Sequence, residues 1–343
     1  MTDSSAQPAS SLGSSVRTLS EEYDLAMLDL DGVVYRGSEA VPGAAFALAA
    51  ARSVGMRLAY ITNNASRPAG AVVARLREMG MPDVADGDVV TSAQAVAHLV
   101  ADAVPPGSPV LLVGGEGLRL PLEERGLRCV TSLDDDPVAV VQGFHPDIAW
   151  PQLAEAAYGI QAGLPWYVSN TDMTVPTARG IAPGNGSLVQ AVRNATGAEP
   201  VVAGKPERAL FDETTERVGG RRPLMVGDRL DTDVDGAIAA GLDSLAVLTG
   251  VSSLAEIMAA EPGHRPSFVA ADLAGLVESH AHVHLDGDRA RCGTAQVEVT
   301  GTTIRSATGR AGSTELLRAA VALAWDARDR RGTRLLPDGT LEA

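Results

Sequence analysis

The sequence predicts an α/β fold: a doubly wound parallel sheet, an α/β module inserted into it, and a small β-α unit appended at the C-terminal end. First, short apolar segments alternate with segments of helical periodicity, as in parallel sheets covered by helices. Second, this alternation starts afresh near Ala95. Third, beyond about residue 280 it gives way to one alternating segment followed by one helical segment.

The first half of the predicted core begins after a leader. Residues 1–20 hold seven serines and no apolar stretch, which predicts a disordered leader and no signal peptide. Residues 23–28 form an apolar run that suits a buried strand. A helix follows from Pro42 to about Ser53, then a buried strand at 57–62, a helix at 69–79 and a short strand at 89–90. This β-α-β-α order favours a Rossmann-like arrangement.

The inserted module is expected over residues 95–180, with strands at 110–113 and 138–142. The core, over residues 21–94, then resumes over 181–278. It adds a helix at 187–196 and strands at 201–203, 224–226 and 244–248. Residues 279–343 form the appended unit, in which 296–306 reads as one strand and 315–331 as a helix. Because that unit is too short to hold a core alone, it must pack on the rest or on another chain.

Composition excludes several classes of protein. The 343 residues carry 28 basic and 43 acidic side chains, a formal net charge of −15, without the basic surface of a nucleic-acid binder. No uninterrupted apolar run of about 18 residues predicts a membrane span. The two cysteines are too far apart for a zinc site and too few for a disulfide scaffold, which indicates a reducing compartment and a cytoplasmic protein.

The lysine count is unusual, because 27 of the 28 basic residues are arginine and only Lys205 is lysine. A compact ammonium on a flexible stem differs chemically from the planar guanidinium fork. A function that arginine cannot serve would explain this lysine, and chance retention is the alternative.

Polar side chains follow four of the predicted strands, where open α/β sheets bind ligands. They are Asp29 and Asp31, Thr62 with Asn63 and Asn64, Lys205, and Asp228. Any one of them has an ordinary structural explanation, but four strand ends agree. Three carboxylates suit Mg²⁺, and a metal with a lysine can neutralise a phosphoryl group while a carboxylate attacks it.

These segments resemble the motifs of the haloacid dehalogenase superfamily of phosphotransferases, and all four occur in order. They are Asp29-Leu30-Asp31-Gly32-Val33-Val34-Tyr35, Thr62-Asn63-Asn64, Gly204-Lys205-Pro206 and Gly227-Asp228-Arg229-Leu230-Asp231-Thr232-Asp233. The resemblance covers about residues 21–275. Within the superfamily the chain resembles the branch of p-nitrophenyl phosphatases and phosphoglycolate and glycerol-3-phosphate phosphatases. The inserted module is then implied to be a large α/β cap that closes over the active site and selects the leaving group.

The resemblance also implies the roles of the site residues. Asp29 would be the nucleophile that forms an aspartyl-phosphate, and Asp31 the acid and later the base. The remaining roles are phosphoryl binding by Thr62 and the amide of Asn63, charge screening by Lys205, Mg²⁺ binding by Asp29, the carbonyl of Asp31 and Asp228, and support by Asp233. Asn63, Asn64, His145, Asn170 and Asp172 are expected near the substrate, although relatives commonly carry Asp where His145 stands.

A large cap favours a small phosphate ester over a phosphoprotein. Among substrates, the resemblance favours glycerol 3-phosphate first and 2-phosphoglycolate second, and it leaves nucleotides and pyridoxal phosphate possible. A phosphotransferase or phosphomutase on the same core is a further alternative, and a homo-oligomer is possible because such caps often pair. A signalling receiver also joins Asp, Thr and Lys at strand ends, but Asp31 and the cap argue against it.

The sequence contains two other candidate metal sites. Residues 231–236 match the opening of an EF-hand loop, but Leu242 stands where that loop needs a bidentate Glu, so this interpretation is rejected. His280, His282 and His284 alternate and, on an extended strand, would project to one side together with Asp286 and Asp288. A weak transition-metal site and an ordinary polar connector both remain open there.

Overall fold

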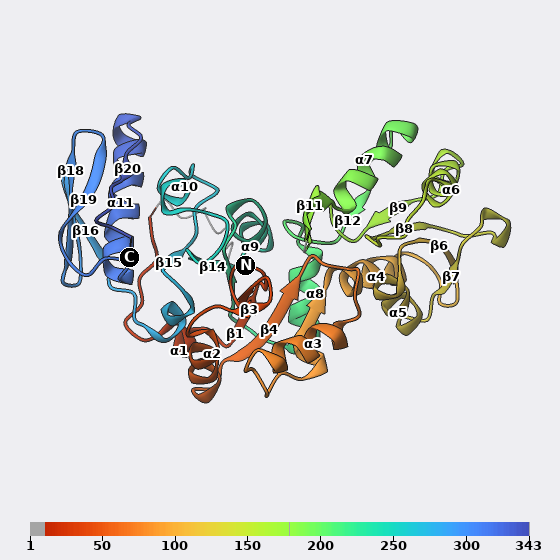
Figure 1. The fold of residues 1–343 in the computed structure, drawn as a ribbon, viewed down its shortest axis with the longest axis horizontal. Helices are drawn as coiled ribbons and strands as arrows, with labels where there is room; N and C mark the ends of the chain where they lie inside the picture. Colours follow the sequence, from red (N-terminus) through yellow and green to blue (C-terminus); the bar gives the residue numbers. More distant parts are fainter. Residues whose placement is uncertain (1–10, 178, 343) are drawn as a thin grey trace, which may run out of the picture. The chain divides into compact units, whose positions relative to one another are not determined.

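The computed structural model describes residues 11–177 and 179–342, and the chain forms two compact units (Figure 1). Unit 1 comprises Met1–Ala59 and Gly219–Ala343, and unit 2 comprises Tyr60–Val218. The chain passes from unit 1 into unit 2 within strand β4 (Arg57–Thr62) and returns after helix α8 (Ala209–Val218). The two units are described separately below.

The sheet of unit 1 is parallel, in the order β15-β14-β13-β1, and the start of β4 lies beside β1, where Arg57 N donates to Asp24 O over 3.0 Å. All four residues of β1 are buried, which explains its continuous apolar run. The elements of this part are α1 (Leu19–Glu22), β1 (Leu25–Leu28), β2 (Tyr35–Arg36), β3 (Glu39–Ala40), α2 (Ala44–Ser53), β13 (Pro223–Gly227), the π-helix η3 (Leu230–Val234), α9 (Asp235–Ala240), β14 (Asp243–Val247), α10 (Leu254–Met258), β15 (Phe268–Ala270) and η4 (Leu273–Val277).

The C-terminal part of unit 1 is a sheet in the order β16-β17-β18-β19-β20, against which helix α11 packs. Its elements are β16 (Val283–Asp286), β17 (Arg289–Cys292), β18 (Ala295–Thr300), β19 (Thr303–Thr308), α11 (Thr314–Arg331) and β20 (Leu336–Pro337). Trp325 of α11 is buried in a core shared with α10, and its Nε1 donates to Ile257 O over 2.8 Å. The helix predicted at 315–331 is therefore present and joins the core of unit 1.

The prediction of one strand over 296–306 is wrong. The segment holds two strands, β18 and β19, which pair antiparallel around a turn at Gly301, whose φ is +62°. Apolar and polar residues mix on both sides of this turn, with Val297 and Val299 before it and Ile304 after it, and such a short pattern fits one strand or two. Glycine adopts this left-handed conformation without steric cost.

Unit 2 contains the end of β4, which pairs in parallel with β5, and a second parallel sheet in the order β12-β9-β8-β6-β7. Its elements are α3 (Ala69–Glu78), η1 (Asp86–Asp88), β5 (Val89–Thr91), α4 (Ser92–Ala103), β6 (Pro109–Val113), α5 (Glu116–Glu124), β7 (Arg128–Val130), η2 (Leu133–Asp135), β8 (Val140–Gln142), α6 (Trp150–Gln161), β9 (Trp166–Val168), β10 (Thr174–Thr177), β11 (Gly180–Pro183), α7 (Asn185–Thr196), β12 (Val201–Val202) and α8. The strands and helices expected between residues 57 and 202 are present with small shifts of their ends.

Strand β12 of unit 2 pairs with a different sheet from the one predicted. Residues 201–203 were expected in the core sheet, but Val201 and Val202 form β12, which pairs with Tyr167 and Val168 of β9. Lys205 therefore follows a strand of the second sheet. A two-residue apolar strand carries too little pattern to identify its neighbour. The boundaries of the core and cap over 21–94, 95–180 and 181–278 remain predictions.

The leader predicted to be disordered is ordered in the part that the structure describes. Residues 1–10 lie outside the described residues. Leu12 is buried, Gly13 N donates to Ser267 O over 2.8 Å, and Ser15 N donates to His280 O over 2.8 Å. The serines and the lack of an apolar stretch predict disorder, but residues 12–15 pack and form hydrogen bonds within unit 1.

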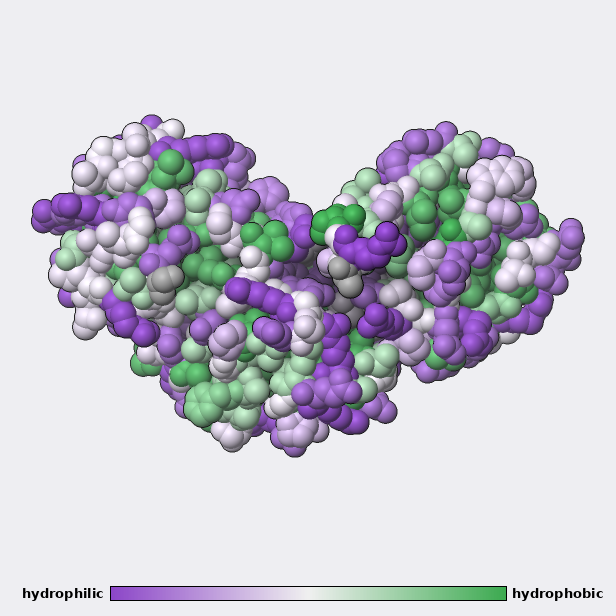
Figure 2. Space-filling view, viewed as in Figure 1, coloured by the Kyte–Doolittle hydropathy of each residue, from purple (hydrophilic) through white to green (hydrophobic). Residues whose placement is uncertain are grey.

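No helix among residues 11–177 and 179–342 is both long and apolar enough to cross a bilayer. On the face drawn in Figure 2, hydrophobic residues lie in small groups between hydrophilic ones. The surface seen in that view is therefore mixed in polarity.

Candidate active site

Three carboxylates of unit 1 converge beyond the neighbouring strands β1 and β13. Asp29 follows β1 directly, and its N–H donates to Val226 O of β13 over 2.9 Å. Asp228 follows β13, and Asp233 lies in η3. Each of the three offers a carboxylate oxygen, and these oxygens lie within 4.8 Å of one another. The parallel register of β1 and β13 places their ends together, as the sequence predicts for Asp29 and Asp228.

Backbone amides hold Asp228 and Asp233 in place. Val251 N donates to Asp228 Oδ2 over 2.7 Å, while Asp228 N and Arg229 N both donate to Asp233 Oδ2 over 3.1 Å. Asp228 and Asp233 are each only 1% exposed, whereas Asp29 is partly buried. Asp233 thus fixes the backbone that carries Asp228, an arrangement that fits the supporting role predicted for it.

Two glycines give the Asp228 carboxylate its space. A Cβ on Gly250 or on Gly32 would overlap Asp228 Oδ2, and Gly32 has a φ of +91°. Gly32 also turns the chain after Asp31, with its N–H donating to Tyr35 O over 2.8 Å. Asp31 is exposed beside this turn.

The residues of the acidic cluster fit a divalent cation. Their donors are carboxylate oxygens, the ligands preferred by Mg²⁺ and Ca²⁺, and the glycines leave room on the side of Asp228. Buried carboxylates this close repel each other, and a bound cation offsets that repulsion.

A polar cluster of unit 2 joins the end of β4 to the segment after β12. The side chain of Asn63 makes hydrogen bonds with both the N–H and the C=O of Lys205, over 2.8 and 3.0 Å. Asn170 Nδ2 donates to Asn63 O over 2.7 Å, and Asp172 Oδ1 accepts from Asn63 Nδ2 over 3.1 Å. Four predicted residues from distant parts of the sequence are therefore brought together.

The other predicted residues of unit 2 are arranged differently. Thr62 Oγ1 accepts from Asn64 N over 3.1 Å, and the exposed Asn64 side chain accepts from Ser66 N over 2.9 Å. The ring of His145 lies against Gly115, where a Cβ would overlap it, and its Nδ1 accepts from Asp147 N over 3.3 Å. His145 thus lies beside the residue that precedes α5, apart from the hydrogen bonds of Asn63.

Sequence reasoning missed Ser92 and Asn185, which both belong to the polar cluster. Ser92 is fully buried and its Oγ donates to Asn63 O over 2.5 Å. Asn185 Nδ2 donates to Asn170 O over 2.7 Å. Ser92 lies two residues after the predicted strand at 89–90, as Lys205 lies two residues after the one at 201–203, so the criterion applied to the other strand ends would have found it. Asn185 is the first residue of α7 and follows none of the predicted strands, so it gives no such signal.

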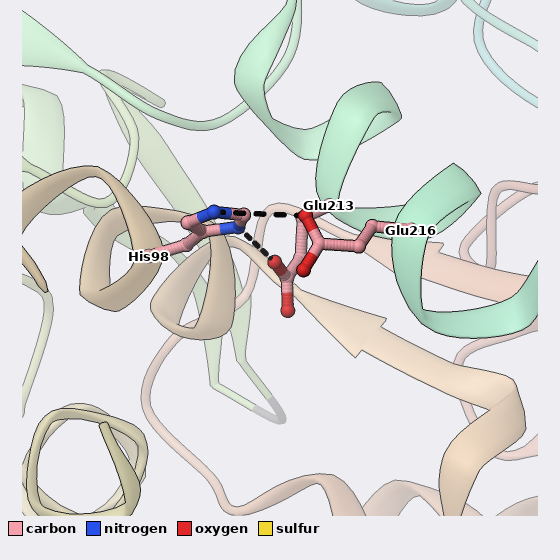
Figure 3. Close-up of side chains that lie close together, drawn as sticks. All are labelled: His98, Glu213 and Glu216. Atoms are coloured by element: carbon pink, nitrogen blue, oxygen red, sulfur yellow. Dashed lines mark hydrogen bonds and ion pairs between the residues drawn. The ribbon is translucent and has the colours of Figure 1, made fainter. Parts of the chain in front are cut away.

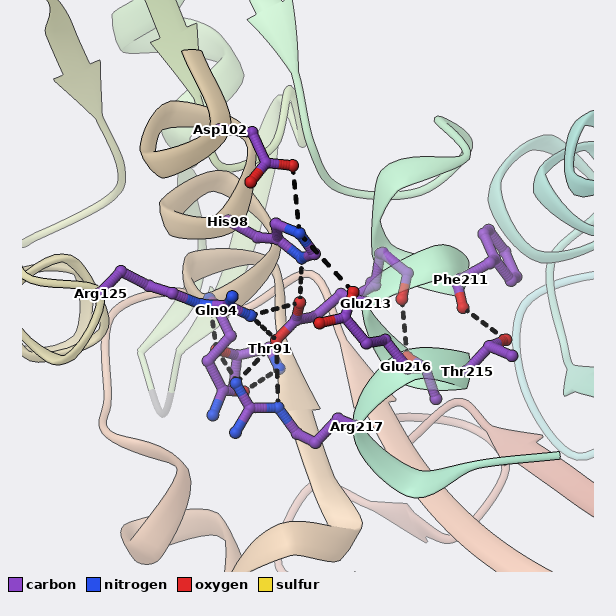
Figure 4. A network of polar contacts seen from close by, with 12 residues as sticks. Thr91, Gln94, His98, Asp102, Arg125, Phe211, Glu213, Thr215, Glu216 and Arg217 are labelled. Carbon is purple, nitrogen blue, oxygen red and sulfur yellow. Dashed lines mark hydrogen bonds and ion pairs between the residues drawn. The ribbon is translucent and has the colours of Figure 1, made fainter. Parts of the chain in front are cut away.

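The charged cluster of unit 2 is centred on Glu213, which is 1% exposed (Figure 4). Its carboxylate accepts from Arg125 over 2.9 Å and from Arg217 over 2.7 Å, and lies 2.5 Å from His98 Nδ1. Figure 3 shows His98 of α4 directed at Glu213 and Glu216 of α8. Two arginines already balance Glu213, so this cluster ties α4 to α8 rather than offering an open ligand site.

Comparisons with known proteins identify the family of this chain. A haloacid dehalogenase-like hydrolase model matches residues 26–128, and a second model of that kind matches residues 202–276. A D-glycerol 3-phosphate phosphatase from Mycobacterium tuberculosis is 48% identical over 261 residues, which cover 76% of this chain and 73% of that protein. The chain belongs to the haloacid dehalogenase-like hydrolases.

Other members of the haloacid dehalogenase-like hydrolases extend this result. An acid sugar phosphatase from Staphylococcus aureus is 35% identical over 69% of this chain and 91% of its own length. A crystal structure of a glycerol phosphate phosphatase from M. tuberculosis in complex with magnesium has a TM-score of 0.81 and 41% identity, covering 94% of both chains. A 4-nitrophenylphosphatase from Thermotoga maritima has a TM-score of 0.69 and 31% identity, covering 76% of this chain and 98% of its own. The predicted superfamily, its branch and the α/β fold class are confirmed.

Proposed function

We propose that this haloacid dehalogenase-like hydrolase is a Mg²⁺-dependent phosphatase that hydrolyses glycerol 3-phosphate. The observation that carries the proposal is the convergence of the Asp29, Asp228 and Asp233 carboxylates at the ends of β1 and β13. A partly buried carboxylate beside a cation-binding group is the arrangement needed for nucleophilic attack on a phosphate ester.

In the proposed reaction Asp29 and Asp31 do the covalent work. A carboxylate oxygen of Asp29 attacks phosphorus, and the bond from phosphorus to the glycerol oxygen breaks. Asp31 gives its proton to the departing alkoxide and later takes a proton from the water that attacks the aspartyl-phosphate. The bond from phosphorus to the Asp29 oxygen then breaks, which releases inorganic phosphate and regenerates the Asp29 carboxylate.

The other residues position and neutralise the phosphate. Asp29, the carbonyl of Asp31 and Asp228 would hold Mg²⁺, which supplies positive charge to the phosphoryl oxygens when bound. We propose that Thr62 and the amide of Asn63 bind phosphoryl oxygens and that the Lys205 ammonium offsets their charge.

The choice of glycerol 3-phosphate rests on the similar M. tuberculosis protein named for it. The acid sugar phosphatase from S. aureus keeps other small polyol phosphates in view. 2-Phosphoglycolate, nucleotides and pyridoxal phosphate remain alternatives, as does transfer to an acceptor other than water.

The test is phosphate release from these esters and from 4-nitrophenyl phosphate, with Mg²⁺ or with EDTA. We expect Asp29→Asn and EDTA to abolish release and Asp134→Asn, in the exposed η2 turn, to leave it unchanged. Relative kcat/KM identifies the substrate. Release from wild type that persists in Asp29→Asn would refute the proposed nucleophile, and no release from any ester would refute the phosphatase.

We also propose a cytoplasmic location, which the two free thiols support. Burial raises the pKa of the Cys129 thiol to about 11 and raises that of Cys292, so neither is a ready thiolate. A homo-oligomer remains a prediction, for which light scattering of the purified chain is the measurement.

A further inference from the structure

The side chain of Asn63 pairs with the main chain of Lys205. Asn63 Oδ1 accepts the Lys205 N–H over 2.8 Å, and Asn63 Nδ2 donates to the Lys205 C=O over 3.0 Å. Both backbone groups of one residue are therefore satisfied by one amide side chain, as a neighbouring β-strand would satisfy them. This pair fixes the backbone on both sides of the Lys205 Cα.

The donors of the Asn63 amide are both used. A carboxamide carries two N–H donors, and those of Asn63 go to Lys205 O and to Asp172 Oδ1, at 3.0 and 3.1 Å. The side chain therefore has no further N–H for a substrate oxygen. The motif predicts Asn63 near the substrate, but in the structure its side chain bonds to Lys205 and Asp172.

Asn63 is itself held on its other side. Its carbonyl oxygen accepts from Ser92 Oγ over 2.5 Å and from Asn170 Nδ2 over 2.7 Å. Ser92 is completely buried, Asn170 is 3% exposed and Asn63 is 9% exposed. Water competes little for hydrogen bonds in such surroundings, so this network holds Asn63 in one orientation.

The segment around Lys205 is shaped to accept this contact. A Cβ on Gly204 would lie 2.7 Å from Asn63 Oδ1 and 2.6 Å from Ser169 O, so a side chain at that position would push the segment away. Lys205 is 3% exposed and is the single lysine of the chain. Its four-carbon stem has many rotamers, so the place of the ammonium depends on a fixed backbone.

We propose that Asn63 is a positioning residue whose side chain acts through Lys205 and not through the substrate. Its effect on turnover rests on the proposed phosphatase function, but its effect on the place of Lys205 does not. The predicted binding of a phosphoryl oxygen by the backbone amide of Asn63 is unchanged.

The first test uses Lys205 as a spectroscopic probe. In the full chain labelled with ¹³C,¹⁵N-lysine, the Cε and Nζ signals come from Lys205 alone. We expect Asn63→Ala to shift and broaden them, and Asn194→Ala, which removes an exposed contact of α7, to leave them in place. Asn63→Asp is the second variant: it keeps an acceptor for the Lys205 N–H but loses both donors, so we expect a shift there too.

The second test is a double-mutant cycle on kcat/KM with Asn63→Ala, Lys205→Ala and the double variant. We expect Asn63→Ala to lower kcat/KM about 100-fold, as misplacement of a catalytic group does. If Asn63 acts through Lys205, its substitution has no further effect once Lys205 is alanine.

Three outcomes would refute the positioning role of Asn63 or distinguish its failure from failure of the proposed phosphatase function. Lysine signals of Asn63→Ala that coincide with wild type would refute the positioning role, even if the variant melts at a lower temperature. Losses that multiply in the double variant would show that Asn63 acts independently of Lys205. If wild type releases no phosphate from any ester, the proposed function fails and the lysine spectrum still decides the positioning role.

Discussion

His280 makes the stability of unit 1 depend on pH. It is fully buried, and its Nε2 lies 2.8 Å from Gly275 O, which can only accept. Nε2 therefore carries the proton, and Nδ1 accepts from the Arg318 guanidinium over 3.2 Å. A second proton on Nδ1 would face that cation. Burial, and to a lesser extent the charge of Arg318, lowers the pKa of His280 to about 4, although the bond to Gly275 opposes the change.

The direction in which stability changes with pH follows from how many protons the folded and unfolded chains bind. An unfolded histidine has a pKa of about 6.5, so below that pH the unfolded chain binds more protons at His280 than the folded chain. The stabilisation is complete above about pH 7 and is lost as the pH falls toward 4. At pH 5 the loss is about 2 kcal/mol, and below pH 4 it approaches about 3 kcal/mol.

The assay is urea unfolding at pH 8 and pH 5, followed by tryptophan fluorescence in a Trp150→Phe, Trp166→Phe background, where the remaining Trp325 is buried in the same unit as His280. The comparison is with His280→Gln, whose amide can donate to Gly275 but cannot take up a proton. The other five histidines are the same in both proteins, so their contributions cancel in the comparison. We expect wild type to lose about 2 kcal/mol more than the variant between the two pH values. Equal losses would refute this account of His280.

Three further tests concern the charged cluster, the acidic cluster and the packing. Glu213→Gln leaves two arginines without a carboxylate and should lower the free energy of unfolding by about 2 kcal/mol. Its control Glu216→Gln, whose side chain is 63% exposed, should change that free energy by less than about 0.5 kcal/mol. Both are measured by urea unfolding followed by the fluorescence of Trp166, which is buried in unit 2, in a Trp150→Phe, Trp325→Phe background. Gly250→Ala should weaken Mg²⁺ binding at least about tenfold by calorimetry, because its Cβ displaces the Asp228 carboxylate, and unchanged binding would contradict the proposed metal ligand. Trp325→Ala should lower the free energy of unfolding by about 3–5 kcal/mol in a chemical denaturation experiment, because it leaves a cavity in the core and removes the hydrogen bond to Ile257. A decrease below about 1 kcal/mol would contradict this packing.

The parallel strands were predictable because burial on both faces leaves an apolar run that ends abruptly. Residues 23–28 and 224–226 gave such runs, and the structure places β1 and β13 side by side in register. Asp29 and Asp228 then meet for a reason already contained in the pattern, since adjacent parallel strands end at the same edge.

Pairing choices that depend on distant partners were not predictable. β12 is two residues long, and its position beside β9 depends on Tyr167 and Val168, which are more than thirty residues away. His280 appeared to belong to an alternating strand with His282 and His284. In the structure β16 starts only at Val283, and His280 is instead buried against Arg318. Alternation in a sequence does not show whether the backbone is already part of a sheet.

The contrast between Asn63 and Asn64 shows where motif reasoning stops. Both follow β4, and the motif predicts both of them at the substrate. The buried Asn63 bonds to Lys205, which lies 142 residues further along the chain, while the exposed Asn64 bonds to Ser66 two residues away. A motif identifies residues that share a site, but a residue can serve that site by holding another residue's backbone. The lysine spectrum and the double-mutant cycle separate these two roles, because only a positioning residue loses its effect when Lys205 is removed.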